Sequence, residues 1–248
     1  MKYTAAANYY LNKFGGRGGT RTLKAFGQRI LSPPRIPIPP LARSSHFSII
    51  NNMKQIFIIH GGQSFSSYSA YISNLKSKSI EYECLKYSQR WREWIAQNMP
   101  RADVLLPNMP SSDNAQYEEW KIYFEKMIPF FRKDVQLVGH SLGAMFLAKY
   151  LQNYPLSHPL RRLILIAGVY DKKVSGESNS FLPLKTDRLY LSAQEIHLFH
   201  SEDDQVVPYT ELAKFQADLP SAITHSFIDR GHFIDPTFPE LLKILKQK

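Results

Sequence analysis

Six short apolar runs recur along residues 53–248, and they are continuous, or nearly so, rather than alternating with polar residues. A strand with one wet face alternates, whereas a continuous run indicates a strand that is covered on both faces. Stretches with apolar residues three and four apart separate the runs, a spacing typical of amphipathic helices. The expected strands are 55–60, 103–106, 135–139, 163–167, 196–200 and 223–228, and the expected helices are 117–131, 141–150, 211–219 and 239–245. The alternation predicts an α/β fold, with an open, mostly parallel sheet and helices on both faces.

The first 52 residues differ from the rest of the chain in charge and in pattern. They carry eight basic residues and no Asp or Glu, and Gly-rich and Pro-rich stretches replace any apolar periodicity. We expect residues 1–52 to be a disordered basic leader, or upstream sequence that is not part of the native protein, ahead of an α/β domain at 53–248. An organelle transit peptide and a tail that binds phosphate backbones are the alternatives.

Charge and composition exclude several classes of protein. Of the 31 basic residues, 23 lie in 53–248 beside 21 acidic ones, so this part is near neutral and gives no indication of nucleic-acid binding. No run approaches the roughly 18 apolar residues of a membrane span, so no membrane partner is expected. The single cysteine, Cys84, excludes an intramolecular disulfide and a Cys-rich zinc site. Cytoplasm is therefore the expected location.

The sequence Gly139-His140-Ser141-Leu142-Gly143 is a G-x-S-x-G motif between an expected strand and an expected helix. In that context a sharp strand-to-helix turn lifts a serine hydroxyl clear of the sheet. Glycines without a Cβ let the strand and the helix pack closely around the turn, and the helix amides favour negative charge there. Ser141 is therefore the candidate nucleophile.

A serine nucleophile needs a base, and His232 is the candidate because it follows the last expected strand, at the sheet edge where Ser141 is expected. An acid must hold the histidine tautomer, and Glu202, Asp203 and Asp204 all follow the penultimate strand. We favour Asp204, which stands just before the chain turns into the next helix, and Asp203 is the alternative. The resulting chain order, Ser141, Asp204, His232, is that of α/β-hydrolases.

Two backbone N–H groups have to stabilise the negative charge that develops on a tetrahedral intermediate. One is expected from Leu142, the residue after the nucleophile. The other is expected from the turn after the first strand, His60-Gly61-Gly62-Gln63. We assign Gly62, with Gln63 as the alternative.

The motifs together resemble a known family. Residues 53–248 resemble a compact α/β-hydrolase, and the HGG turn, the LPNMP segment at 106–110 and the GHSLG motif resemble the serine hydrolases related to retinoblastoma-binding protein 9. The resemblance implies a Ser-His-Asp triad at Ser141, Asp204 and His232, with no cofactor and no metal ligand. It does not imply retinoblastoma binding, because the single cysteine is not part of an L-x-C-x-E sequence.

The expected activity is hydrolysis of an ester, thioester or amide of a small to medium acyl substrate through an acyl-enzyme, with the substrate and water as the only partners. The long connection 171–192 is expected to be a loop or lid that favours such substrates. Trp91, Trp94 and Trp120 are expected in the core rather than in an acyl pocket. The alternative function is a non-catalytic module that binds a ligand or a protein on an α/β-hydrolase scaffold. The sequence assigns no oligomeric state.

Overall fold

The computed structural model describes residues 53–173 and 175–247. The leader expected at 1–52 lies outside the described residues, so its disorder and the domain boundary at Met53 stay predictions. Within the described ranges, no helix combines the length and the hydropathy needed to cross a bilayer.

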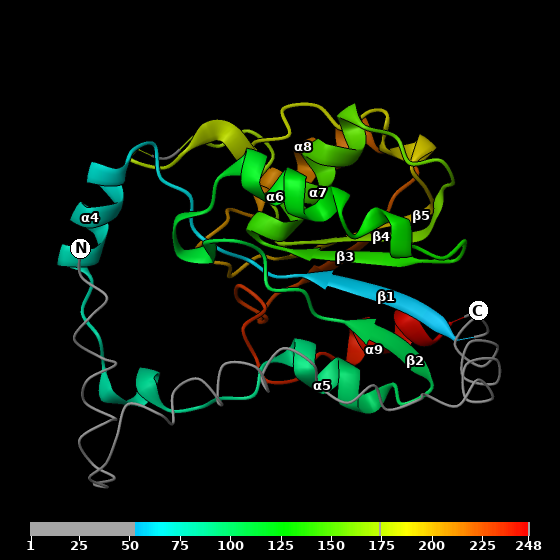
Figure 1. Cartoon of the computed structure of the whole chain (residues 1–248), viewed down its shortest axis with the longest axis horizontal. Helices are drawn as coiled ribbons and strands as arrows, with labels where there is room; N and C mark the ends of the chain where they lie inside the picture. Colours follow the sequence, from blue (N-terminus) through cyan, green and yellow to red (C-terminus); the bar gives the residue numbers. More distant parts are fainter. Residues whose placement is uncertain (1–52, 174, 248) are drawn as a thin grey trace, which may run out of the picture. The chain divides into compact units, whose positions relative to one another are not determined.

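All six expected strands are present and form one parallel sheet (Figure 1). The strand order across the sheet is β2-β1-β3-β4-β5-β6. The strands are β1 (Lys54–Ile59), β2 (Ala102–Leu105), β3 (Gln136–His140), β4 (Leu160–Ile166), β5 (Ala193–Ser201) and β6 (Ile223–Phe227). The predicted fold class is confirmed. The strand order also indicates where a ligand site is expected, because β1 lies between β2 and β3. Because the chain runs from β1 outward to β2 and then returns to the other side of β1 as β3, the carboxyl ends of β1 and β3 flank a topological switch point.

Helices cover both faces of the sheet. The six helices of the described residues are α4 (Tyr68–Ser77), α5 (Trp91–Asn98), α6 (Tyr117–Glu125), α7 (Leu142–Asn153), α8 (Thr210–Asp218) and α9 (Pro239–Lys246). Helices α6, α7 and α8 pack on one face, and α5 and α9 pack on the other (Figure 1). The expected helix at 117–131 ends early, at Glu125, and a short 3-10 turn at Ile128–Phe130 that contains Pro129 follows it.

The sequence analysis missed α4 and α5. Helix α4 has the spacing of an amphipathic helix in Tyr68, Tyr71, Ile72 and Leu75, a signal that could have found it, although the helix buries none of its residues. Helix α5 has eight residues and buries two of them, Trp91 and Ile95. That is too short a pattern for the helical period to stand out.

The central strand β1 shows why the apolar runs are continuous. Phe57 and Ile59 belong to the core under α6 and α7, whereas Ile56 and Ile58 belong to the core under α5 and α9. Successive side chains of a strand point to opposite faces, so a strand between two helix layers is apolar at every position.

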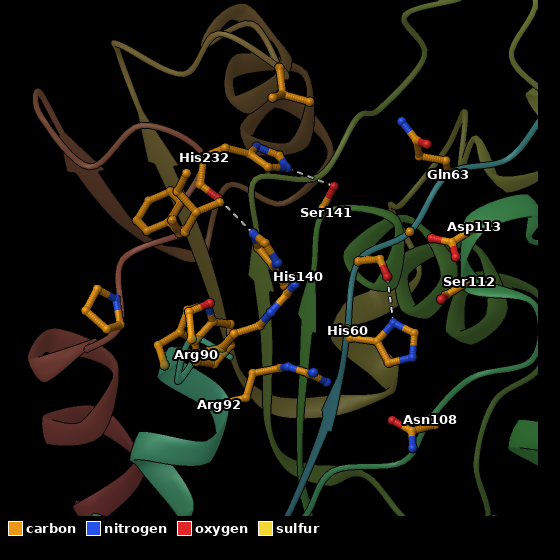
Figure 2. A pocket seen from close by; sticks show the side chains of 18 of the residues that line it. His60, Gln63, Arg90, Arg92, Asn108, Ser112, Asp113, His140, Ser141 and His232 are labelled. Carbon is orange, nitrogen blue, oxygen red and sulfur yellow. Dashed lines mark hydrogen bonds between the residues drawn. The ribbon is translucent and has the colours of Figure 1, made fainter. Parts of the chain in front are cut away.

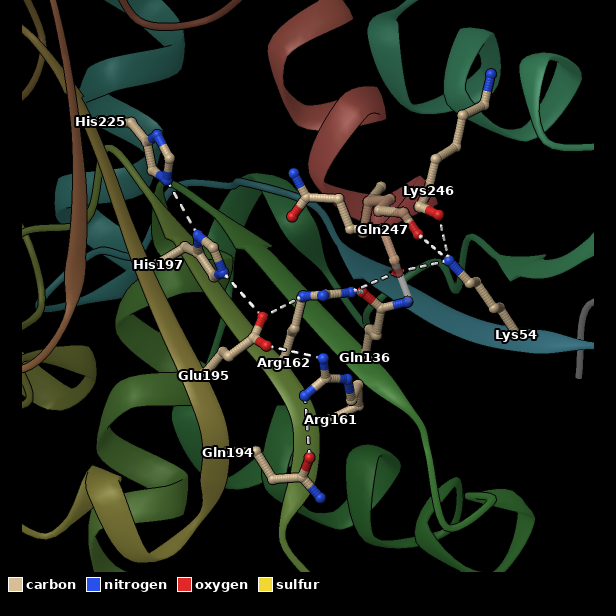
Figure 3. A network of polar contacts seen from close by, with 11 residues as sticks. Lys54, Gln136, Arg161, Arg162, Gln194, Glu195, His197, His225, Lys246 and Gln247 are labelled. Carbon is tan, nitrogen blue, oxygen red and sulfur yellow. Dashed lines mark hydrogen bonds and ion pairs between the residues drawn. The ribbon is translucent and has the colours of Figure 1, made fainter.

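A polar network closes the amino-terminal end of the sheet, away from the switch point (Figure 3). The Arg162 side chain is 2% exposed, and its Nε lies 2.5 Å from the Glu195 carboxylate. The Lys54 ammonium donates to the carbonyls of Lys246 and Gln247, at 2.6 Å each. A cation at the last carbonyls of α9 is favourable because the helix dipole is negative there, so the network anchors α9 to the sheet.

Candidate active site

A cavity of about 860 Å³ opens at the switch point (Figure 2). Its lining comes from the ends of β1 and β3, the segments around 88–92 and 108–113, and the loop that follows β6. Ser141 and His232 both line it. The position agrees with the rule that open parallel sheets bind ligands outside the carboxyl ends of their strands.

Ser141 occupies a strained turn between β3 and α7. Its backbone angles are φ 54° and ψ −120°, in a region that residues with a side chain rarely adopt. Such strain costs on the order of 1–3 kcal/mol and persists only where the surrounding structure imposes it. A Cβ at Gly143 would lie 2.5 Å from the Ile59 carbonyl oxygen, and one at Gly139 would lie 2.5 Å from the Gly143 carbonyl oxygen. Both glycines of the motif are therefore needed for α7 to start this close to the sheet.

The structure brings Ser141, His232 and Asp204 together from three separate loops. His232 Nε2 is 2.9 Å from Ser141 Oγ, and its Nδ1 is 2.8 Å from Asp204 Oδ2. These partners indicate the tautomer with the proton on Nδ1, which donates to the carboxylate and leaves Nε2 to accept from the hydroxyl.

The Asp204 carboxylate is fully buried and is held in its ionised form. Its side chain has no exposed surface, and Oδ1 accepts from the N–H groups of Val206 and Val207 at 2.8 and 2.9 Å. Burial by itself raises the pKa of this carboxyl. The hydrogen bonds from His232 and from the two amides outweigh burial, so the pKa of Asp204 lies below its ordinary value.

Asp203, the alternative acid, contacts the His232 loop rather than the imidazole. Its Oδ1 accepts from the Gly231 N–H at 2.9 Å and from the Ser201 hydroxyl. The same hydroxyl oxygen accepts from the Arg230 N–H at 3.0 Å. The sequence analysis assigned Asp203 no such part, although its position beside Asp204 places it at the same sheet edge.

Two further histidines hold the backbone around Ser141, and the sequence analysis gave neither a role. His140 donates from Nε2 to the His232 carbonyl at 2.9 Å. His60 donates from Nδ1 to the Gly61 carbonyl at 2.6 Å and accepts the Met109 N–H at Nε2, at 2.8 Å. Burial lowers the pKa of His60, and burial together with the charge of His232 lowers the pKa of His140 to about 4. Both rings are therefore neutral at pH 7, and for His60, which donates from one ring nitrogen and accepts at the other, the hydrogen bonds require it.

The two residues that carry the candidate backbone donors lie beside one another. Leu142 is the first residue of α7, where the helix dipole favours negative charge. A Cβ at Gly62 would lie 3.3 Å from Leu142 Cδ2 and 2.6 Å from the Ser112 carbonyl oxygen, so only glycine fits this turn. The Gln63 N–H already donates to that carbonyl at 2.8 Å, whereas the described residues offer no such partner for the Gly62 N–H.

The connection 171–192 is the expected loop between β4 and β5, but it does not form a lid over the cavity. No described residue of this segment lines the cavity. Phe181 and Leu189 are fully buried in the core, and the Thr186 N–H donates to the Asp218 carboxylate at 2.6 Å. The segment packs against the helix layer, so it gives no support for a preference for short acyl chains.

The tryptophans lie in the cores, as expected. Trp120 has no exposed surface and donates from Nε1 to the Pro110 carbonyl at 2.8 Å, and Trp94 packs partly buried against the second core. Trp91 is buried too, but it also lines the cavity and lies edge-on to His140. Across the part of the chain that the structure describes, no group of three or more His, Cys, Asp or Glu side chains is arranged to hold a metal ion.

Comparisons with known proteins agree with this geometry. The serine hydrolase family model matches residues 86–236. The serine hydrolase RBBP9 of Rattus norvegicus is 27% identical over 165 residues, which are 63% of this chain and 84% of the rat protein. YdeN of Bacillus subtilis (strain 168) is 24% identical over 198 residues, which are 73% of this chain and 87% of YdeN.

The crystal structure of the B. subtilis ydeN gene product has the same fold. It superposes with a TM-score of 0.60 at 21% identity, over 78% of this chain and 97% of that structure. The family match spans more than half of the chain and contains the G-x-S-x-G turn and the two loops that carry Asp204 and His232. The chain belongs to the serine hydrolase family, as a compact α/β-hydrolase of the RBBP9 and YdeN type, and is an enzyme with hydrolase activity.

Proposed function

We propose that the enzyme cleaves carboxylic esters, thioesters or amides through an acyl-enzyme on Ser141. The observation that carries the proposal is the hydrogen-bonded series from Ser141 through His232 to the buried Asp204, set at a strained turn that opens into the cavity. A serine hydroxyl is a weak nucleophile, and a neutral imidazole at 2.9 Å is the base that activates it.

In the proposed reaction, Ser141 Oγ attacks the substrate carbonyl carbon while its proton passes to His232 Nε2. The carbonyl oxygen becomes an oxyanion, and the N–H groups of Leu142 and Gly62 stabilise it; each such donor is worth about 3 kcal/mol. The bond to the leaving group then breaks, and His232 returns the proton to that group. Water repeats the sequence on the acyl-enzyme, and the carboxylic acid leaves.

Asp204 acts through His232 in this scheme. When His232 takes the serine proton it becomes an imidazolium, and a carboxylate 2.8 Å from its Nδ1 stabilises the new charge. The two amide bonds to Oδ1 keep this carboxylate ionised and fix its direction. The buried Asp204 carboxylate thus stays ionised and stabilises the imidazolium, whereas the partly exposed His232 accepts and returns the proton.

Labelling with a fluorophosphonate probe tests the proposal, because the probe reacts with a serine that a nearby base has activated. We expect the wild-type protein to be labelled, and Ser141→Ala and His232→Ala not to be. Ser157→Ala and His158→Ala are matched controls, because both residues are exposed, lie outside the cavity and should leave labelling unchanged. Absence of labelling in a folded wild-type protein would favour the non-catalytic binding module instead.

A further inference from the structure

Two arginines line the cavity next to Ser141, and the proposed hydrolysis uses neither. Arg90 and Arg92 stand on either side of the first residue of α5. Figure 2 shows both side chains pointing toward the side of the cavity that His60 and His140 flank. The sequence analysis gave these arginines no role, since only the tertiary fold brings α5 to the switch point.

The Arg92 guanidinium is buried without a full set of partners. The side chain is 14% exposed, and its Nη1 has no hydrogen-bond partner among the described residues. Its Nη2 lies 3.6 Å from the Glu93 carboxylate, which is beyond hydrogen-bond distance and is itself 37% exposed. A guanidinium stays charged in proteins, and a buried charge is costly unless it is paired and hydrogen-bonded. A bound anion would supply the missing partner.

The positive charge lies close to the reacting centre. Burial lowers the pKa of His60, and the charges of Arg92 and Arg90 lower it further. The Arg92 charge also adds to burial and to His232 in lowering the pKa of His140. These two histidines and both arginines line the same cavity as Ser141, so the guanidinium charge lies within the site itself.

The rest of the lining suits an anionic group. Asp113 is the acidic side chain that lines the cavity together with the two arginines, and in Figure 2 it lies on the far side of His60 from them. The uncharged side chains of Gln63, Asn108 and Ser112 also face it. Positive charge therefore exceeds negative charge in the cavity wall, and hydrogen-bonding groups are available around it.

We propose that Arg92, assisted by Arg90, binds a carboxylate carried by the substrate, so that the enzyme acts on carboxylate-bearing esters. The planar fork of a guanidinium matches a carboxylate in two parallel hydrogen bonds, which gives both affinity and orientation. The inference rests on the proposed function, because it names the substrate class of that same site.

Two matched ester pairs test the proposal and locate the carboxylate. 4-Acetoxybenzoate and its methyl ester differ in charge on the leaving group, and p-nitrophenyl hydrogen adipate and its methyl ester differ in charge on the acyl group. After each kcat/KM is divided by the rate of the same ester with hydroxide, we expect wild type to favour the charged member of at least one pair by about tenfold or more, which is ~1.4 kcal/mol.

Variants assign that preference to the arginines. We expect Arg92→Gln to bring the charged-to-neutral ratio close to one, Arg90→Gln to lower it less, and Arg92→Lys to keep part of it because the charge remains. Arg101→Gln is the matched control, because it removes an exposed arginine outside the cavity and should keep the wild-type ratio.

A measurement on wild type alone covers the case in which Arg92→Gln does not fold. Adipate should slow fluorophosphonate labelling of Ser141 at concentrations at which the neutral diamide adipamide does not. Two results would overturn the subsite and leave the triad standing, provided that the probe labels the protein. One is a charged-to-neutral ratio close to one for both ester pairs, and the other is the absence of protection by adipate. A folded protein that the probe does not label would instead overturn the proposed function.

Discussion

Asp204→Asn separates the two acids that the sequence offers, and the structure predicts how the substitution acts. Oδ1 of Asp204 accepts two backbone N–H groups, and Oδ2 accepts the Nδ1–H of His232. An asparagine has one oxygen, and the two amides require it at the Oδ1 position. Its NH2 group would then face His232 and can only donate.

The imidazole would respond by changing its tautomer. With a donor facing Nδ1, the ring is stable with Nδ1 as acceptor and the proton on Nε2. That proton would point at Ser141 Oγ, 2.9 Å away, so His232 could no longer accept the serine proton. In another Ser-His-Asp enzyme, loss of the correct tautomer lowers kcat by about 10⁴-fold, and we expect the same order here, or ~5.5 kcal/mol of transition-state stabilisation.

The assay is steady-state hydrolysis of a p-nitrophenyl ester together with the rate of fluorophosphonate labelling, with thermal unfolding as the check on folding. Asp203→Asn is the matched control. Its side-chain oxygen can still accept the Gly231 N–H, so we expect a loss of about tenfold or less from the weakened loop contact.

If Asp204→Asn keeps its activity within about tenfold of wild type while Asp203→Asn loses about 10³-fold, then the tautomer argument is wrong and Asp203 is the acid.

Three further predictions follow from single contacts. A Cβ at Gly62 would lie 2.6 Å from the Ser112 carbonyl oxygen, so Gly62→Ala should lower kcat by about 100-fold or more in the ester assay; an unchanged kcat would remove Gly62 from the oxyanion site. The pKa of His140 is about 4 in the folded protein and about 6.5 in an unfolded chain, so between these values only the unfolded chain binds the proton. The free energy of unfolding should therefore fall as the pH drops from 6.5 toward 4, by at most about 3 kcal/mol; urea unfolding should show this slope in wild type and a flatter one in His140→Phe, and equal slopes would contradict it. Arg162→Met removes the buried partner of Glu195 but leaves the Arg161 ion pair at 2.8 Å, so it should lower the free energy of unfolding in urea by about 1.5–3 kcal/mol, and a loss below about 0.5 kcal/mol would show that the pair stabilises little.

The parallel sheet could be predicted because its cause is local. Strands between two helix layers must be apolar on both sides, so each left a continuous run that stands out in the sequence. Helix α6, with one buried face, also shows its period in the sequence, whereas α7 is buried almost all round and is apolar at most positions. Helix α4 carries the same spacing at Tyr68, Tyr71, Ile72 and Leu75 although it buries none of its residues, so the period alone does not show which helix packs on the sheet.

Part of the candidate site could be predicted for a related reason. Ser141 lies in a turn whose glycines are required by close contacts with neighbouring backbone. The requirement can be recognised in the sequence because the turn consists of five consecutive residues, 139–143. His232 and the 202–204 acids follow strands that end at the same edge of the sheet. Parallel strands deliver the residues after them to one edge, so chain order alone brings these candidates near Ser141.

The sequence by itself determined the fold class, the strained turn at Ser141 and the edge of the sheet at which His232 and the 202–204 acids lie. Only the tertiary structure decided that Asp204 rather than Asp203 contacts His232, that no described residue of 171–192 lines the cavity, and that Arg92 does line it. Adjacent carboxylates have the same composition and nearly the same place in the chain, and the direction of each side chain depends on contacts with distant backbone. A local sequence pattern reflects interactions between residues that are close in the chain. The His232–Asp204 contact and the lining of the cavity depend instead on which distant segments the folded chain brings together.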